Sequence, residues 1–392
     1  IWKAIVMAIV LFDNRERAGL YPLTTNKAVA DLRIGILRIK EWWLRKTNLR
    51  PYVATTPALQ ILYSPIPEGE HIWIDASIVP DDALVQRILK LQSGHCLVDA
   101  FGLVAGKTAQ RNWDYASNDI GNFPNQQKVD TVKRLQYPWE IFQWNDKAIR
   151  EDFQLLTHRR KSQPLSDTNR IQQYSAIFVE EGARVEYAML NATQGPIYIG
   201  KNAVIQEGAM IFGPVAIGTH AMVKMGATVY GATTIGPWCV AGGEIKNVVM
   251  MGYSNKGHHG YLGDSVVGEW CNFGAGTSNS NVKNTAETVT LWHEATQSWK
   301  PVGQKCGLIM GDYSRTAINS SINTGSVIGI SSNLFGAGLL PRVIPDFTWG
   351  DGQERYRLDK AIEAIGNWKK MKGQSISPAE IAVLQHIFEQ QA

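Results

Sequence analysis

Residues 199–235 read IGKNAV IQEGAM IFGPVA IGTHAM VKMGAT VYGATT I when they are written in blocks of six. Each block begins with isoleucine or valine, and the residue four places later is small, from Ala203 through Ala227 to Cys239. A second period of eighteen is superimposed, with glycine at Gly200, Gly218 and Gly236. Six residues make a short strand and its turn, and three such units close a triangular coil, so the pattern predicts the hexapeptide repeats of a parallel β-helix.

The β-helix is predicted to extend over residues 176–346. Its pattern is regular up to Ala241, loosens around residues 247–260, and breaks between residues 284 and 305. Within this second break, residues 288–292 and 299–302 are expected to pair as a hairpin that leaves the coil. Loops that interrupt a solenoid project from one face, where function tends to lie.

The flanking regions differ in character. Residues 1–160 predict an α/β domain, with strands at 4–12, 71–79 and 96–105, helices at 27–46 and 82–91, and an exposed linker at 159–164. The apolar run that opens the chain is interpreted as a buried strand rather than a signal peptide. Residues 353–392 are predicted to be helical, with a capping box from Ser377 to Glu380, and to cover the open end of the β-helix.

Composition excludes several classes of function. The net charge is +4 over 392 residues, without a long run of lysine or arginine, which argues against nucleic-acid binding. No segment approaches the ~20 apolar residues of a membrane span. The four cysteines share no Cys-x-x-Cys spacing, so reduced thiols and a cytoplasmic location are expected.

Reactive residue types gather in residues 246–281. His258 lies in a loop flanked by glycines, where an imidazole is solvated and suited to act as a general base. The alternative is that His258 and His259 are ordinary surface loop residues.

A motif favours the first alternative. His258 lies three residues before Tyr261-Leu262-Gly263-Asp264, and Asn272-Phe273-Gly274-Ala275-Gly276-Thr277 follows. This segment strongly resembles the acetyltransferase half of the bifunctional glucosamine-1-phosphate acetyltransferase / N-acetylglucosamine-1-phosphate uridyltransferase family. The resemblance implies a left-handed β-helix, with an α/β nucleotidyltransferase-like (reduced Rossmann-like) domain before it and helices after it.

The resemblance also implies roles for residues. His258 would be the base that takes a proton from the sugar amine, and Lys246, Tyr261 and Asn272 would contact the sugar phosphate. Lys224 stands where the family has an arginine for the phosphate, and lysine lacks the two-pronged guanidinium. Ala275 and Asn281 would line the acyl-CoA site, although Val282 stands where the family has a tyrosine.

The implied reaction is direct acyl transfer from acetyl-CoA to an amino-sugar phosphate, a step that needs no metal. The family forms homotrimers with sites between neighbouring solenoids, and Trp238, Trp270 and Trp292 are candidates for contacts between subunits.

The N-terminal region resembles sugar-nucleotide pyrophosphorylases in residues 17–27, with Arg17 and Lys27 as nucleotide-binding candidates. The glycine-rich loop of that family is replaced by residues 11–16, which contain no glycine to let a triphosphate approach the backbone. Asp75 would hold Mg²⁺ if the domain is active, or cap a helix if it is not.

Three alternatives stay open. The chain is an acyltransferase fused to a degenerate nucleotidyltransferase, or an active nucleotidyltransferase that takes a nucleoside triphosphate and is trimerised by its β-helix. The third alternative is a non-catalytic protein that binds nucleotide sugars.

Overall fold

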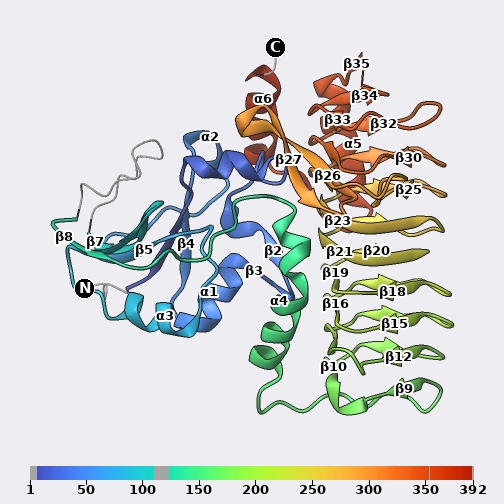
Figure 1. The fold of residues 1–392 in the computed structure, drawn as a ribbon, viewed down its shortest axis with the longest axis horizontal. Helices are drawn as coiled ribbons and strands as arrows, with labels where there is room; N and C mark the ends of the chain where they lie inside the picture. Colours follow the sequence, from blue (N-terminus) through green and yellow to red (C-terminus); the bar gives the residue numbers. More distant parts are fainter. Residues whose placement is uncertain (1–6, 110–122, 353, 391–392) are drawn as a thin grey trace. The chain divides into compact units, whose positions relative to one another are not determined.

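The computed structural model describes residues 7–109, 123–352 and 354–390 (Figure 1). Contacts group the chain into two compact units, which are treated separately below. Unit 1 comprises Ile1–Leu20, Asn26–Leu32 and Leu37–Tyr137, and unit 2 comprises Tyr21–Thr25, Arg33–Ile36 and Pro138–Ala392. The boundaries 1–160, 176–346 and 353–392 stay predictions, and residues 4–6 of the predicted first strand lie outside the described residues.

Unit 1 is an α/β domain built on a mixed sheet in the order β4-β1-β5-β7-β6-β8. Strands β4, β1 and β5 are parallel, whereas β7 is antiparallel to both β5 and β6. The strands are β1 (Ile9–Phe12), β4 (Pro51–Ala54), β5 (His71–Asp75), β6 (His95–Asp99), β7 (Gly102–Thr108) and β8 (Asn125–Lys128). The helices are α1 (Ile39–Thr47), α2 (Pro57–Gln60) and α3 (Asp82–Leu89), and α3 confirms the helix expected near residues 82–91.

Two predicted elements of the N-terminal region were wrong. The helix expected at 27–46 is α1 alone, preceded by the short strands β2 (Arg33–Ile34) and β3 (Leu37–Arg38). Gly35 has a φ of 74°, and its amide donates to Asn145 Oδ1, so the chain turns where a helix would continue. The single strand expected at 96–105 is the hairpin β6–β7, because Asp99 accepts a hydrogen bond from the amide of Phe101 and forms a turn.

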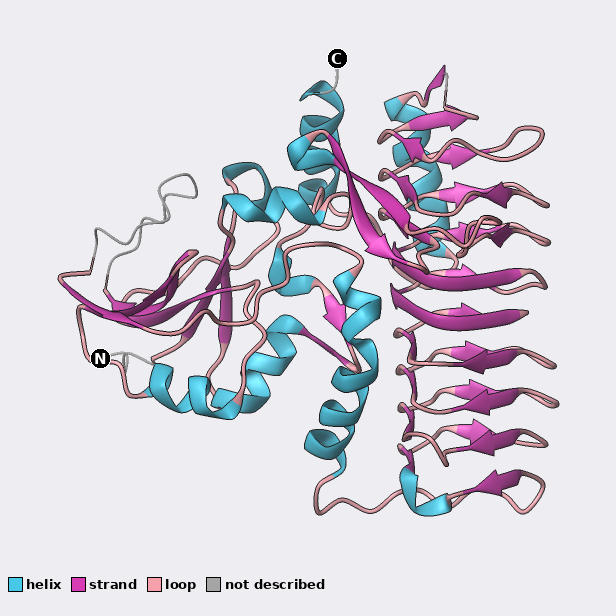
Figure 2. Ribbon diagram, in the orientation of Figure 1, coloured by secondary structure: helices cyan, strands magenta, loops and turns pink. Residues whose placement is uncertain are grey.

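Unit 2 is a parallel β-solenoid with three faces, as the period of six predicted (Figure 2). The first face contains β10 (Ile177–Val179), β13 (Ile197–Ile199), β16 (Val215–Ile217), β19 (Thr233–Ile235), β28 (Leu308–Met310), β31 (Ser326–Ile328) and β33 (Val343–Ile344). The second contains β11 (Arg184–Val185), β14 (Val204–Ile205), β17 (Met222–Val223), β20 (Val240–Ala241), β22 (Asn255–Lys256), β24 (Asn272–Phe273), β29 (Arg315–Thr316), β32 (Asn333–Leu334), β34 (Thr348–Gly350) and β35 (Glu354–Arg355). The third contains β9 (Arg170–Gln172), β12 (Met189–Asn191), β15 (Met210–Phe212), β18 (Thr228–Tyr230), β25 (Ser278–Asn279) and β30 (Ser321–Ile322).

The long strands β21 (Glu244–Gly252) and β23 (Tyr261–Glu269) bend through a corner and belong to both the first and the third face. The repeated isoleucines and valines fill the interior, where Ile199, Ile217 and Ile235 are fully buried. The glycines with a period of eighteen allow successive coils to touch. A Cβ on Gly236, for example, would lie 2.3 Å from the carbonyl oxygen of Met250.

The two predicted breaks have different structures. Where the pattern loosens, the coil persists but shortens, since Ala241 pairs with Lys256, fifteen residues later rather than eighteen. The break at 284–305 contains the expected hairpin, formed by β26 (Val289–His293) and β27 (Ser298–Gly303) with Trp292 opposite Trp299. The solenoid therefore runs through both breaks.

The C-terminal helices α5 (Leu358–Lys370) and α6 (Pro378–Gln390) do not cover the open end of the solenoid. They pack on its side, in one apolar cluster with Trp270, Tyr313 and Phe347. These three residues have positive φ and lie at one corner of the solenoid, together with Tyr253, whose ring stacks on Trp270 at 4.3 Å. Trp270 is therefore covered by its own chain. The capping box is confirmed, because the amide of Glu380 donates to Ser377 Oγ and that of Ser377 to Glu380 Oε2.

The segment before the solenoid contains a helix that the sequence did not predict. Residues Glu140–Thr157 form helix α4, which contacts β19, β21 and β23 (Figure 1). Of the predicted linker, Arg160 forms an ion pair with Glu180 on the first coil. All four cysteines are buried and free. In the described parts of the chain, none of the helices combines the length and the apolar character that crossing a bilayer requires. The cytoplasmic location stays a prediction.

Candidate functional site

Three of the predicted site residues come together on the third face of the solenoid. Lys246 lies on β21 and Tyr261 on β23, and Asn281 is the second residue after β25. Lys246 pairs with Tyr230 of the coil before, and its Nζ lies 5.5 Å from the centre of the Tyr230 ring. We call the group of Tyr230, Glu244, Lys246, Tyr261, Asp264 and Asn281 the Lys246 cluster.

Hydrogen bonds join Tyr261, Asp264 and Asn281 within the Lys246 cluster. Asn281 Nδ2 donates to the Tyr261 hydroxyl at 3.0 Å and also to Asp264. Gly263 makes room for the phenol, since a Cβ there would lie 2.2 Å from the Tyr261 oxygen. Burial and the nearby charge of Asp264 raise the pKa of Tyr261 to about 12. Tyr261 is therefore a neutral hydrogen-bonding group at physiological pH, able to donate to a phosphate or a sugar oxygen.

The His258 loop lies at the corner between the second and third faces, where β22 passes into β23. Both His258 and His259 are exposed. Beneath them Lys256 is 1% exposed, and its Nζ donates to the carbonyl oxygens of His258 and His259 at 2.6 and 3.1 Å. Burial lowers the pKa of Lys256 to about 8. The backbone of the loop is therefore held from inside the coil while its imidazoles stay accessible to a substrate.

Further predicted residues lie near that corner without joining the Lys246 cluster. Lys224 follows β17 and Ala275 follows β24, so both lie at the same corner as the His258 loop, on other coils. Asn272 is half-buried on β24, on the second face, where it pairs with Arg315. Among the described residues, no side-chain hydrogen bond links His258 to the Lys246 cluster. On one chain the predicted site residues therefore lie in three neighbouring places, which are the His258 corner, the Lys246 cluster and the second face at Asn272.

In unit 1, polar residues lie at the carboxyl ends of the parallel strands, the edge at which open α/β sheets bind ligands. Asp13 follows β1 and is buried, and Arg17 Nε donates to it at 3.0 Å. Thr55 after β4 donates to the same carboxylate at 2.7 Å. Burial raises the pKa of Asp13 despite the adjacent Arg17 charge. Lys27 is buried and its carbonyl oxygen accepts from Arg17, so both nucleotide-binding candidates are tied into this network.

Asp75, the candidate Mg²⁺ ligand, ends β5 and is buried. Its Oδ2 accepts from Arg134 Nε and Asn14 Nδ2, both at 3.0 Å, and its Oδ1 accepts from Ser77. Arg134 also bonds Asp99, so one guanidinium already neutralises two carboxylates. Within the described ranges, no group of three acidic, histidine or cysteine side chains is arranged to hold a metal. This arrangement favours an ion pair, and Mg²⁺ binding by Asp75 stays a prediction.

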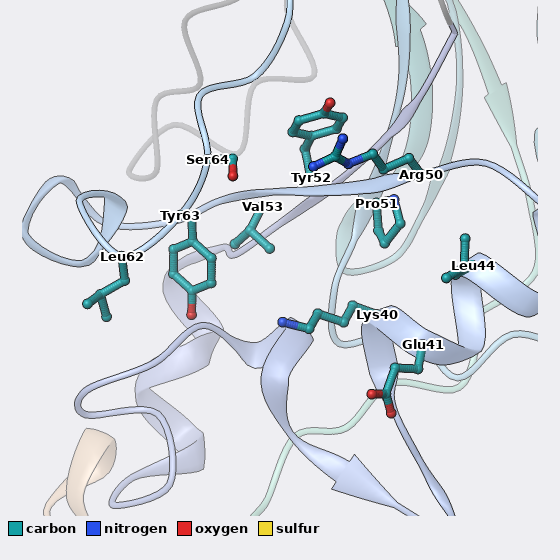
Figure 3. A pocket seen from close by; sticks show the side chains of 10 residues that line it. All are labelled: Lys40, Glu41, Leu44, Arg50, Pro51, Tyr52, Val53, Leu62, Tyr63 and Ser64. Carbon is teal, nitrogen blue, oxygen red and sulfur yellow. The ribbon is translucent and has the colours of Figure 1, made fainter. Parts of the chain in front are cut away.

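A cavity of about 370 Å³ lies beside the edge strand β4 of unit 1 (Figure 3). Arg50 lies against Tyr52, with its Cζ 5.1 Å from the ring centre, and Lys40 comes from α1. The lysine is already paired with Asp31, and Tyr63 donates to the same carboxylate. The charge of the cavity is therefore largely compensated, so we do not place the main site here.

Comparisons with known proteins point to one group. Residues 9–161 match the family model described as sugar nucleotidyl transferase. The chain is 37% identical over 97 residues to the bifunctional protein GlmU of Methanococcus vannielii, a match that covers 25% of this chain and 23% of that protein. It is 31% identical over 108 residues to GlmU of Methanocaldococcus jannaschii, covering 27% and 26% of the two chains. A protein of Sulfurisphaera tokodaii named bifunctional sugar-1-phosphate nucleotidylyltransferase/acetyltransferase is 32% identical over 99 residues, covering 25% and 24%.

Over these matched stretches the chain is similar to GlmU proteins. The resemblance to this family is thereby supported, and unit 1 contains most of the matched sugar nucleotidyl transferase region. The matched stretches span only about a quarter of the length of these relatives. Activity, substrates and partners are therefore matters for proposal.

Sequence reasoning missed Lys256, Arg134 and Arg315 as residues of interest. Lys256 occupies an interior position, paired with the core residue Ala241, but the fifteen-residue coil shifts it out of the regular period. A lysine at a predicted interior position would have been the signal, had the shortened coil been recognised.

Proposed function

We propose that unit 2 transfers the acyl group of acetyl-CoA to the amine of an amino-sugar 1-phosphate, with His258 as the general base. The observation that carries the proposal is the Lys246 cluster, in which Lys246, Tyr261 and Asn281 gather beside the corner that bears His258. An ammonium, a neutral phenol and an amide are suited to a sugar phosphate. The name of the Sulfurisphaera tokodaii relative, which includes acetyltransferase, agrees with this chemistry.

In the proposed reaction, the neutral amine of the sugar attacks the carbonyl carbon of the thioester. The new C–N bond forms as His258 accepts the amine proton, and the C–S bond then breaks to release CoA as its thiol. Backbone N–H groups would stabilise the oxyanion of the tetrahedral intermediate. The exposed imidazole of His258 is accessible for this role, and Lys256 fixes the backbone that carries it.

We further propose that the working assembly is a homotrimer in which a neighbouring solenoid completes the site. On one chain the His258 corner, the Lys246 cluster and Asn272 lie apart. This separation supports the assembly, because a second chain would complete the site. Release of free thiol from acetyl-CoA that depends on glucosamine-1-phosphate tests the reaction, and light scattering tests the trimer.

A second candidate function is sugar-nucleotide synthesis by unit 1, supported by the family match over residues 9–161. Asp13, Thr55 and Asp75 at the carboxyl ends of β1, β4 and β5 would then surround the nucleotide. If Mg²⁺ takes part, Asp75 would hold it and it would neutralise phosphate charge, which requires the Arg134 ion pair to open. Release of UTP from a nucleotide sugar by pyrophosphate tests this activity. Binding of nucleotide sugar without turnover would favour the non-catalytic alternative.

A further inference from the structure

Arg315 is a buried guanidinium on the second face of the solenoid. It lies on β29, is 7% exposed, and is covered by helix α5, with the ring centre of Trp368 5.5 Å from its Cζ. Burying an arginine is costly unless its charge and its N–H groups are matched.

The described part of the chain does not match this charge. Arg315 Nε and Nη2 are buried and have no hydrogen-bond partner among the described residues. The groups that act on Arg315 electrostatically are Cys271, Tyr356 and Tyr313, none of which is a carboxylate. Burial accordingly lowers the pKa of Arg315, although a guanidinium stays charged at physiological pH.

Glu380, an acidic residue of the covering helices, already has other partners. Glu380 forms an ion pair with Lys369 and accepts hydrogen bonds from Ser377 and Tyr313. The C-terminal helices therefore cover Arg315 without neutralising it, which leaves the guanidinium suited to an anion from outside.

The neighbours of Arg315 suit such an anion. It pairs with Asn272 on the preceding coil and Asn333 on the following one, so an amide flanks the guanidinium on each side. Adjacent strands lie about 4.8 Å apart, a spacing that lets neighbouring side chains share one small ligand. Both asparagines are half-buried, so the row can be reached from solvent. A guanidinium and amide N–H groups together bind phosphate oxygens well.

We propose that Arg315, with Asn272 and Asn333, forms a phosphate-binding subsite between the second face and α5. The inference rests on the proposed function in one respect, since Asn272 is also the residue expected to contact the sugar phosphate. The phosphate would be that of the amino-sugar acceptor or one of those of CoA, and the chemistry of recognition is the same for both.

The test measures binding to the intact chain without any turnover. Thermal unfolding is followed with rising inorganic phosphate against chloride of equal ionic strength, for the wild type, Arg315→Met and Arg184→Met. Arg184 is the matched control, because it lies on the same face in the same column but is exposed. Phosphate is expected to raise the melting temperature of the wild type and of Arg184→Met. Arg315→Met should bind phosphate at least about tenfold more weakly, as expected for the loss of a charged hydrogen-bond donor.

A further variant and a competition titration complete the experiment. Arg315→Lys keeps the positive charge but lacks the two-pronged guanidinium, so it should bind phosphate with intermediate affinity. It also provides a second variant to measure if Arg315→Met does not fold. Glucosamine-1-phosphate and CoA are titrated separately as competitors of phosphate, and the one whose affinity drops in Arg315→Met identifies the source. No phosphate effect on the wild type, or an equal effect on Arg315→Met, would overturn the subsite. A chain that binds phosphate through Arg315 but transfers no acyl group would overturn the proposed function alone.

Discussion

The ammonium group of Lys256 donates a hydrogen bond of 2.6 Å to the backbone carbonyl of His258. The lysine reaches this carbonyl from an interior position of the solenoid, where it is 1% exposed and pairs with Ala241. An alkyl side chain would fill that position at lower cost, because a buried charge opposes folding. The buried lysine therefore lowers the stability of the fold, but it holds in place the loop that bears the candidate base.

Lys256→Met is therefore expected to stabilise the protein and loosen the loop. The pKa falls from 10.5 to about 8 on folding, so the unfolded chain binds more protons between these values. The contribution of this lysine to stability is lowest below pH 8 and rises as the pH increases to 10.5, by roughly 3 kcal/mol. At pH 7 the variant should unfold with a free energy ~1–3 kcal/mol higher, since the carbonyls of the exposed loop can bond water instead.

Urea unfolding at pH 7 and pH 10 measures this difference, and Lys256→Arg is the variant that keeps the charge. Amide hydrogen exchange at residues 257–260 should accelerate in Lys256→Met. A methionine variant that is several kcal/mol less stable at pH 7 would show that the lysine is a net structural support.

Tyr261→Phe removes the hydroxyl that accepts from Asn281. If this hydroxyl contacts the sugar phosphate, kcat/KM for the acceptor should fall about tenfold while the fold persists. Steady-state kinetics with varied glucosamine-1-phosphate measure the effect. Tyr187→Phe, at an exposed position of the same solenoid, is the control and should behave as the wild type. Equal kinetics for the two variants would remove Tyr261 from the acceptor site.

The packing of the coils predicts different effects for two glycines. Gly236→Ala places a Cβ 2.3 Å from the carbonyl oxygens of Met250 and Met251, so the variant should lose several kcal/mol or fail to fold. Gly226 has φ of 68° but nothing within 4 Å of the added Cβ, so alanine there should cost about 1 kcal/mol. Chemical denaturation of both variants tests this order, and equal losses would argue against close contact between coils at Gly236.

Arg134 is expected to be essential to the stability of unit 1. Arg134→Met leaves Asp75 and Asp99 without their shared cation, which should cost about 3–5 kcal/mol. The double variant with Asp75→Asn should regain part of this loss. Arg87→Met, at an exposed position of α3, serves as the control, and a similar small loss in both single variants would refute the ion-pair account.

The solenoid could be predicted because its period depends on interactions that repeat. Gly200, Gly218 and Gly236 each lie against the backbone of the next coil, so one chain shows the constraint several times. The hairpin β26–β27 was likewise visible as two apolar runs in a break of the period. The turn at Gly35 was not, because it depends on Asn145 and Asp152, more than a hundred residues later in the chain.

The residues of the candidate site likewise fall into those that the sequence predicted and those that it did not. Lys246 and Tyr261 belong to a motif of fixed spacing, and they lie on adjacent strands of the structure. Lys256 and Arg315 acquire their positions from the fifteen-residue coil and from the hairpin that separates Asn272 from Arg315. A regular period of eighteen predicts neither the shortened coil nor the pairing of strands on either side of the hairpin.

The most direct test of the account is thiol release from acetyl-CoA with glucosamine-1-phosphate, comparing the wild type with His258→Ala and His259→Ala. The adjacent histidine is an internal control, since both are exposed on one loop and Lys256 bonds both carbonyls. The account predicts release that requires the sugar phosphate, falls by about 10²–10⁴ in His258→Ala, and changes little in His259→Ala. Equal rates in the wild type and His258→Ala, or no release from a folded wild type, would contradict it.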